Sequence, residues 1–183
     1  MSKSNRPPHD LGDRSASRHE QKPEYVEVVD RANRFLALFS ADLATEHHLY
    51  HRAVALLIFS RCGKLLLQKK RAPAGKHFYW GVPHTRHMHF REAQQDRAGR
   101  LFISVMGTSA PRLYKKNTKL LPGEHGPIFL TIYSTGKTVP ILLHRSLLPV
   151  DADEMAELVL EFPDLIEPLT ASLWQHRNLL IKH

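Results

Sequence analysis

Histidines that can bind a metal gather in three short stretches of this chain. Imidazole is the commonest ligand for transition metals in proteins, and carboxylates complete many such sites. The stretches hold His47, His48 and His51, then His84, His87 and His89, and finally His125 beside Glu124. If the fold brings these stretches together, the side chains form a site for Zn²⁺, Mn²⁺ or Fe²⁺. Otherwise they are surface histidines in loops.

A second group of residues suits an anionic ligand. Lys69, Lys70 and Arg71 are consecutive, and Lys76 and Arg86 follow them. Arginine binds phosphate oxygens through two parallel hydrogen bonds, whereas lysine supplies a point charge. The formal net charge of +8 and the pI near 9.8 favour phosphorylated metabolites or nucleic acid as partners. The alternative is a solvated strand end, with the net charge aiding only solubility.

Composition excludes several classes of protein. The chain has 183 residues, of which 42% are hydrophobic and 24% charged, as expected for one globular domain. Its single cysteine, Cys62, excludes a disulfide framework and a zinc site made of cysteines alone. No apolar run approaches the roughly 20 residues that span a bilayer, and residues 1–20 lack the apolar stretch of a signal peptide. We therefore expect a cytoplasmic protein that does not enter a membrane.

The elements that must position these residues begin after a polar N-terminal segment. Residues 1–23 are predicted to form a disordered tail, and residues 24–183 a single folded domain. Strands are predicted at Tyr25–Val29, at Ala53–Phe59 and, after a short turn, at Lys64–Gln68. Because Ala53–Phe59 is continuously apolar, that strand is expected to be buried on both faces.

The middle of the chain is predicted to contain loops and two more strands. Pro73–Gly81 is interpreted as a loop that ends in three aromatic residues, and Lys115–Lys119 as a solvated loop. Strands are predicted at Ile128–Tyr133 and at Val139–Leu143, with a turn at residues 134–137 between them.

Helical periodicity appears in three places. The first helix is predicted from about Phe90 to Met106, with Gly107 ending it. A second begins at Asp151, where Glu154 completes a capping-box signature. The last is predicted at Leu165–Ile181. Helices interleaved with strands indicate a single α/β domain.

From residue 49 to residue 107 the order of these elements resembles that of the Nudix superfamily, most closely the isopentenyl-diphosphate isomerase branch. The motifs that carry the resemblance are His51-Arg52-Ala53 at the start of a strand, the basic segment Leu66–Ala72, and Trp80 before the active-site turn. The resemblance extends over about residues 23–181. It implies a Nudix-type α/β/α sandwich with a mixed β-sheet.

The Nudix box is degenerate in this sequence. Aligned without gaps, four box positions are kept, namely Glu92, Arg100, Phe102 and Gly107. The first glycine is Arg86, and the remaining glutamates are replaced by Leu101, Ser104 and Val105. Glutamates on successive helical turns supply the oxygens that bind Mg²⁺ or Mn²⁺, and the metal orients the attacking water. We therefore expect standard Nudix hydrolysis to be lost, and Arg100 to contact a diphosphate or pair with Glu92.

The isomerase resemblance implies particular site residues. The acidic cysteine of that branch is replaced by Thr85, so we do not expect isomerase activity. Of the metal-ligand positions, three carry ligand-type residues, namely His51, His87 and Glu124, whereas two fall on Pro122 and Ala44. The resemblance therefore implies an Mg²⁺, Mn²⁺ or Zn²⁺ site at His51, His87 and Glu124, with Glu124 as the catalytic candidate. It assigns the diphosphate to Lys69, Arg71, Lys76 and Arg86.

The resemblance and the degenerate box together predict two alternative functions. The first is a diverged Nudix-fold protein that binds a phosphorylated small molecule and acts as a sensor, regulator or binding module. The second is a noncanonical metal-dependent diphosphate hydrolase with a rebuilt His/Glu metal site. Phe78, Tyr79 and Trp80 are expected either to stack on a nucleobase or to close the base of their loop, and nucleic acid stays open as a partner. A purely structural role, with no ligand, is the third alternative.

Overall fold

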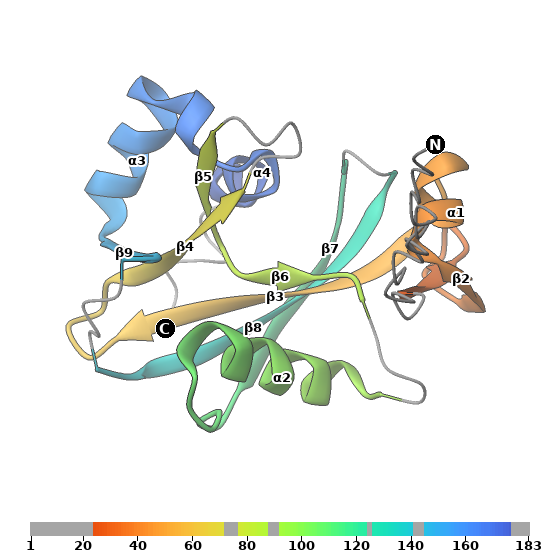
Figure 1. The fold of residues 1–183 in the computed structure, drawn as a ribbon, viewed down its shortest axis with the longest axis horizontal. Coiled ribbons are helices and arrows are strands. Elements are labelled where there is room, and N and C mark those ends of the chain that lie inside the picture. Colours follow the sequence, from red (N-terminus) through yellow and green to blue (C-terminus); the bar gives the residue numbers. More distant parts are fainter. Residues whose placement is uncertain (1–23, 72–76, 88–91, 124–125, 141–144, 177–183) are drawn as a thin grey trace, which may run out of the picture.

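The computed structural model describes residues 24–71, 77–87, 92–123, 126–140 and 145–176 (Figure 1). The predicted tail at residues 1–23 lies outside these ranges, as do Lys76 and Glu124. None of the helices in the described ranges is long and apolar enough to cross a membrane.

The centre of the sheet is β3 (His51–Ser60), which runs parallel to β8 (Ile128–Val139). Every residue of β3 except Arg52 is buried, which confirms the prediction of a strand covered on both faces. Antiparallel partners flank this pair, so the sheet is mixed. The other described strands are β1 (Tyr25–Val29), β2 (Phe35–Ser40), β4 (Leu65–Arg71), β5 (Phe78–Gly81), β6 (His84–Thr85), β7 (Tyr114–Leu121) and β9 (Leu147–Val150).

Helices cover both faces of this sheet (Figure 1). Side chains alternate between the two faces of a strand, so β3 contributes to two separate cores. Val54, Leu56 and Ile58 pack against α2 (Gln94–Met106), whereas the odd-numbered residues from Ala53 to Phe59 pack against α3 (Ala152–Glu161) and α4 (Pro168–Gln175). The predicted α/β/α sandwich with a mixed sheet is confirmed. A short helix, α1 (Ala41–Glu46), lies beside β1 and β2.

Two predicted helix ends are confirmed by their backbone geometry. Gly107 ends α2 with φ of 68°, a conformation that glycine adopts without a steric penalty. Asp151 caps α3 by accepting the amide hydrogens of residues 153 and 154, while the Glu154 carboxylate accepts from the Asp151 amide. This is the capping box that the two residue types predict.

The prediction of two strands separated by a turn at residues 134–137 is wrong. Those residues belong to β8, which continues from Ile128 to Val139. Gly136 has φ of 65°, and the register between β3 and β8 shifts at the same place. The turn signal in the sequence therefore marks an irregularity inside one strand. Residues 141–143 lie outside the described ranges.

Three further assignments need correction. The basic segment Lys115–Lys119 is part of β7, which gains its hydrogen bonds from β8 rather than from solvent. Phe78–Gly81 forms β5, paired with β4, and not the end of a loop. The helix predicted at 165–181 starts later, because a 3₁₀ turn at Pro163–Leu165 is followed by α4, which starts at Pro168. Residues 177–181 lie outside the described ranges. Proline suits the first turn of a helix but not its interior.

Candidate functional site

Five charged side chains form a continuous set of ion pairs between β1, β3 and the N-terminal end of α2. We call this set the charge network; its members are Glu27, Arg52, Glu92, Arg97 and Arg100. Arg100 donates through Nε and Nη2 to the two oxygens of Glu92, both at 2.8 Å. The paired role of Arg100 is therefore confirmed, and it removes Arg100 from the candidates for a free phosphate-binding group.

Arg97 is the innermost member of the charge network. Its side chain is 0% exposed, and Nη2 donates to Glu27 Oε2 at 3.2 Å. Its Nε lies 3.7 Å from Glu92 Oε2, and Arg52 approaches the other oxygen of Glu27 at 3.9 Å. Among the described residues, Nε and Nη1 of Arg97 have no hydrogen-bond partner. A buried guanidinium of this kind persists only because carboxylates balance its charge.

On α2, Arg97 and Arg100 of the charge network come directly before the positions at which the predicted box motif would place metal ligands. Arg97, Leu101 and Ser104 are four and three residues apart and so share one face of the helix. Ser104 donates its hydroxyl hydrogen to the Leu101 carbonyl, and Leu101 itself is buried. The retained box carboxylate, Glu92, is bound by two arginines. These residues do not fit the box metal site.

The rest of the described chain also offers no group of side chains that suits a metal ion. There, no group of three or more histidine, cysteine, aspartate and glutamate side chains is close enough to hold a metal ion. The proposed ligand set of His51, His87 and Glu124 includes one residue outside the described ranges. That ligand set therefore stays a prediction.

His87 has one ring nitrogen fixed by a carboxylate. Its Nε2 lies 2.9 Å from Glu24 Oε2, whereas its Nδ1 is buried and has no hydrogen-bond partner among the described residues. Burial lowers the pKa of His87; Glu24 opposes this shift, and Arg86 and Arg100 add to it. A neutral His87 that donates from Nε2 to Glu24 carries a lone pair on Nδ1.

His51 lies at the start of β3 and is fully buried. Its Nδ1 is 2.9 Å from the Leu49 carbonyl oxygen, and its amide donates to the Pro127 carbonyl. The turn before β8 approaches this segment closely, because a Cβ on Gly126 would lie 2.8 Å from the carbonyl carbon of His48. The stretch around His51 and the residues Gly126 and Pro127 therefore lie side by side.

The predicted diphosphate-binding residues lie in different surroundings. Lys69 and Arg71 are exposed on β4, and the Lys69 ammonium lies 4.6 Å from the centre of the Phe78 ring. Arg86 is half-buried and donates to Thr45 Oγ1 at 2.9 Å. Burial lowers the pKa of Arg86, an effect that nearby carboxylates oppose. Lys76 lies outside the described ranges.

A second cluster of charged side chains, half-buried, is absent from the sequence-based predictions. Lys70 Nζ lies 3.0 Å from both carboxylate oxygens of Glu167, 2.7 Å from His84 Nδ1 and 2.8 Å from the Val82 carbonyl oxygen. Thr170 donates to Glu167 and accepts from the Val82 amide. Lys70 points inward because alternate residues of β4 face opposite sides, with Lys69 and Arg71 facing out.

Burial controls the titration of this cluster. It lowers the pKa of His84 to about 4, an effect that the neighbouring Lys70 ammonium strengthens and Glu167 opposes. Burial also lowers the pKa of Lys70, and Glu167 opposes that shift. His84 is therefore neutral at pH 7 and accepts a hydrogen from the Lys70 ammonium. The cluster links β4, β6 and the start of α4, and we therefore assign it a structural role.

The three consecutive aromatic residues do not form one stacking surface. Phe78 is 51% exposed beneath Lys69, whereas Trp80 packs against the core between β3 and α4. Tyr79 lines a separate hollow of about 460 Å³ together with His77, residues 163–166 and Pro168. Alternation of side chains along β5 places Tyr79 on the face opposite to Phe78 and Trp80.

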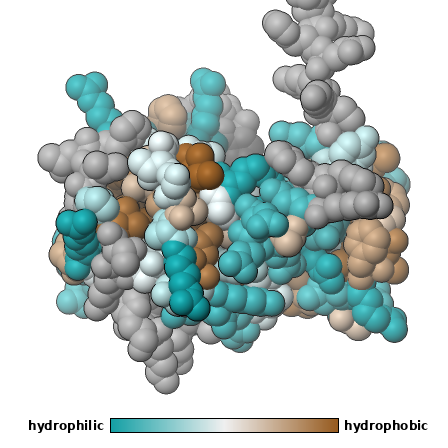
Figure 2. All heavy atoms as spheres, turned by 90° about the horizontal axis from the view of Figure 1, so that it is seen from below, coloured by the Kyte–Doolittle hydropathy of each residue, from teal (hydrophilic) through white to brown (hydrophobic). Residues whose placement is uncertain are grey.

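Hydrophilic side chains cover much of the face of the molecule that carries α2 (Figure 2). Hydrophobic side chains appear at its right-hand end in that view, where Figure 1 places α1 and β2. The exposed apolar residues of this end are Tyr25, Phe35, Leu36 and Leu43.

Comparison with known proteins supports the fold. No family model matches the chain, and no curated protein matches its sequence. Among solved structures, a NUDIX hydrolase from Nitrosomonas europaea is similar with a TM-score of 0.52 and 15% identity, over 69% of this chain and 87% of that one. A structure described as an ADP compounds hydrolase is similar with a TM-score of 0.51 and 17% identity, over 87% of this chain and 95% of that one. At these identities the likeness concerns the fold.

Proposed function

We propose that this chain, whose fold is that of Nudix hydrolases, binds a phosphorylated or diphosphate-containing ligand without metal-dependent Nudix hydrolysis. The observation that carries the proposal is the burial of Arg97 on the α2 face where the box motif places carboxylates. Its guanidinium balances Glu27 and Glu92. Loss of the metal-binding carboxylates removes several kcal/mol of transition-state stabilisation from diphosphate cleavage.

Arg86 is the proposed primary contact for the anion. It follows β6, is half-buried, and lies next to His87 at the margin of the charge network. A guanidinium in partly desolvated surroundings binds phosphate oxygens more strongly than an exposed ammonium group. Lys69, Arg71 and Lys76 are proposed as additional contacts from β4 and from the segment after it.

The choice of ligand class draws on two supports. A chain with a net charge of +8 attracts anions. One structurally similar protein is described as acting on ADP compounds. We therefore propose a nucleoside diphosphate or a related diphosphate ester as the ligand. The likeness to the isopentenyl-diphosphate isomerase branch stays a prediction from sequence motifs.

The test measures binding and turnover separately. ADP and inorganic pyrophosphate are titrated into the full chain by calorimetry in the presence of EDTA, and turnover is followed by mass spectrometry with Mg²⁺, Mn²⁺ and Zn²⁺ in turn. We expect binding in EDTA and no turnover with any metal. Arg86→Ala should weaken binding about tenfold, as loss of a charge-assisted contact predicts, whereas Lys115→Ala, at an exposed site on β7, should not. Absence of binding, or metal-dependent turnover, would overturn the proposal.

The second candidate function is the noncanonical hydrolase with His51, His87 and Glu124 as metal ligands. The observation that favours it is the orientation of His87, whose Nε2 meets Glu24 while its buried Nδ1 has no hydrogen-bond partner among the described residues. Metal-binding histidines commonly hold one nitrogen against a carboxylate and present the other to the metal. A bound metal would supply Lewis-acid activation of the diphosphate.

Metal content distinguishes the two candidates. The hydrolase predicts a stoichiometric Zn²⁺ or Mn²⁺ in the purified chain and turnover that disappears in Glu124→Gln. It also predicts that His87→Ala lowers the metal content, whereas His47→Ala, at an exposed neighbouring position, leaves it unchanged. The binding protein predicts no such metal and unchanged ligand affinity in Glu124→Gln.

A further inference from the structure

The acidic residues of this basic chain are concentrated at one place. Between Arg145 and Arg177 the sequence contains no lysine or arginine. The same stretch holds seven of the chain's 18 acidic residues, namely Asp151, Asp153, Glu154, Glu157, Glu161, Asp164 and Glu167. All except Glu167 are exposed, so α3 and the turn after it form an acidic surface on a molecule with a net charge of +8.

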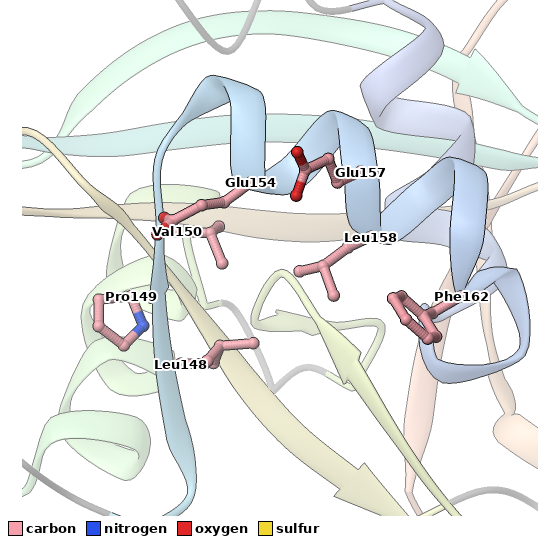
Figure 3. A pocket seen from close by; sticks show the side chains of 7 residues that line it. All are labelled: Leu148, Pro149, Val150, Glu154, Glu157, Leu158 and Phe162. Carbon is pink, nitrogen blue, oxygen red and sulfur yellow. The ribbon is translucent and has the colours of Figure 1, made fainter.

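An apolar pocket opens beside these carboxylates. It has a volume of about 250 Å³ and lies between β9 and α3. Figure 3 shows Leu148, Leu158 and Phe162 pointing into this space, with Glu154 and Glu157 along α3. Its remaining lining residues are Pro149 and Val150. We call the pocket and its acidic margin the acidic groove.

The apolar surface continues beyond the pocket. Phe162 is 54% exposed, and Leu165, whose amide donates to the Phe162 carbonyl, is 43% exposed. Exposed aromatic and aliphatic side chains beside a concave site are typical of an interaction surface. A volume of about 250 Å³ is below the roughly 300 Å³ at which pockets for complete small molecules begin. The pocket therefore suits a single anchoring side chain.

The charges around the pocket indicate which kind of segment would carry the anchoring side chain. Glu154 is already paired with Lys64, at 2.9 Å. Among the described residues, Glu157 and Glu161 have no ion-pair partner, and both are exposed. Carboxylates at the rim of an apolar site attract cationic partners and repel anionic ones. The surroundings of the pocket thus select a basic segment and disfavour an acidic one.

We propose that the acidic groove binds a lysine- or arginine-rich segment of a partner protein that inserts one leucine-sized apolar side chain between Leu148, Leu158 and Phe162. The rim carboxylates of Glu157 and Glu161 face the basic residues on either side of the anchor. Because the groove is built from residues of α3 and β9, and the proposed anion site from Arg86 after β6 with additional contacts on and after β4, no residue is shared and the two proposals fail independently.

The first experiment uses synthetic peptides and the full wild-type chain. A seven-residue peptide, Lys-Arg-Lys-Leu-Lys-Arg-Lys, is titrated by fluorescence anisotropy, and its site is mapped by ¹H–¹⁵N chemical shifts. We expect shifts at residues 148, 157, 158 and 162. Exchange of the central leucine for serine should weaken binding about tenfold or more, as removal of one buried leucine side chain predicts. A peptide with glutamate at every basic position should not bind, and high salt should weaken the basic peptide.

Variants test the two parts of the groove against matched controls. Phe162→Ser removes an apolar wall and is compared with Leu120→Ser, an exposed leucine on β7. Glu157→Lys reverses a rim charge and is compared with Glu46→Lys at the end of α1. The groove variants should weaken binding about fivefold to tenfold, whereas the controls bind as the wild type does.

Four results would overturn the proposal. They are no binding of the basic peptide, shifts that map to another face, equal affinity for the leucine and serine peptides, and concentration-dependent shifts of α3 without peptide. The last result would assign the groove to a second copy of this chain. Because the peptide comparisons use the wild-type chain, they decide the question even if a groove variant does not fold.

Discussion

Arg97 on α2 donates to Glu27 on β1 at 3.2 Å, across 70 positions of sequence, in a place that excludes solvent from the arginine. This pair links α2 to β1, the first strand. Arg97 also places a positive charge on the face of α2 to which the predicted box motif assigns metal ligands. The proposed absence of metal-dependent hydrolysis rests on this relationship.

Loss of the Arg97 charge should be costly. Among the described residues, Arg97→Met leaves the carboxylate of Glu27 with the more distant Arg52 as its remaining ion-pair partner. Removal of one partner from a buried pair costs about 3–5 kcal/mol of unfolding free energy. Urea denaturation should show this loss, and Glu27→Gln in the same chain should restore part of it. Lys115→Met, at an exposed position, should change stability little. Equal stability of the Arg97 variant and the wild type would contradict the assigned role.

Gly81 should tolerate no side chain. A Cβ at this position would collide with the Glu167 carboxylate, which Lys70 holds in place. Gly81→Ala should therefore destabilise the fold by about 1–3 kcal/mol, as overpacking does. The control is Gly99→Ala, because a Cβ there meets nothing within 4 Å and the residue lies inside α2. Alanine in a helix interior should stabilise by about 0.5–1 kcal/mol. Thermal unfolding of both variants tests the contrast.

His84 should make stability depend on pH. The pKa of His84 in the folded chain is about 4, below the ordinary value of 6.5. Between these two pH values, His84 is therefore protonated in the unfolded chain and neutral in the folded chain. The stabilisation from neutral His84 is fully present above pH 6.5 and is lost as the pH falls toward 4. Denaturant midpoints at pH 7, 5.5 and 4 should therefore converge between the wild type and His84→Gln. A constant difference over this range would exclude His84 as the titrating group.

Cys62 should be a reactive thiol. It is exposed in the turn between β3 and β4, and Ser60 Oγ lies 3.1 Å from its sulfur. This hydrogen bond is the main cause of a lowered pKa, because it stabilises the thiolate. Ser60→Ala should shift the pH profile of alkylation by iodoacetamide upward. Lys64→Ala, which removes a weaker influence, should shift it less. An unchanged profile in Ser60→Ala would contradict this cause.

Local signals in the sequence predicted much of the fold. The unbroken apolar run of β3, the glycine at the end of α2 and the Asp151–Glu154 box each specify a structure through residues that are close together in the chain. The same locality explains the correct pairing of Arg100 with Glu92, which lie eight positions apart. Where local signals were weak, the prediction failed. Lys115–Lys119 forms a strand only because β8 supplies its hydrogen bonds.

The sequence by itself determined the α/β class and the order of most elements, because both depend on residue types and spacing, and it predicted the loss of the box glutamates on the same grounds. Only the tertiary structure decided which charges meet. Arg97 and Glu27 are 70 positions apart, and Lys70 and Glu167 are 97 apart, so both pairs depend on which strands and helices become neighbours. The sequence also does not show which of three consecutive basic residues on a strand faces the interior, because all three are of the same type. The fold turns Lys70 inward and leaves Lys69 and Arg71 to the solvent, because side chains on a strand alternate between its faces.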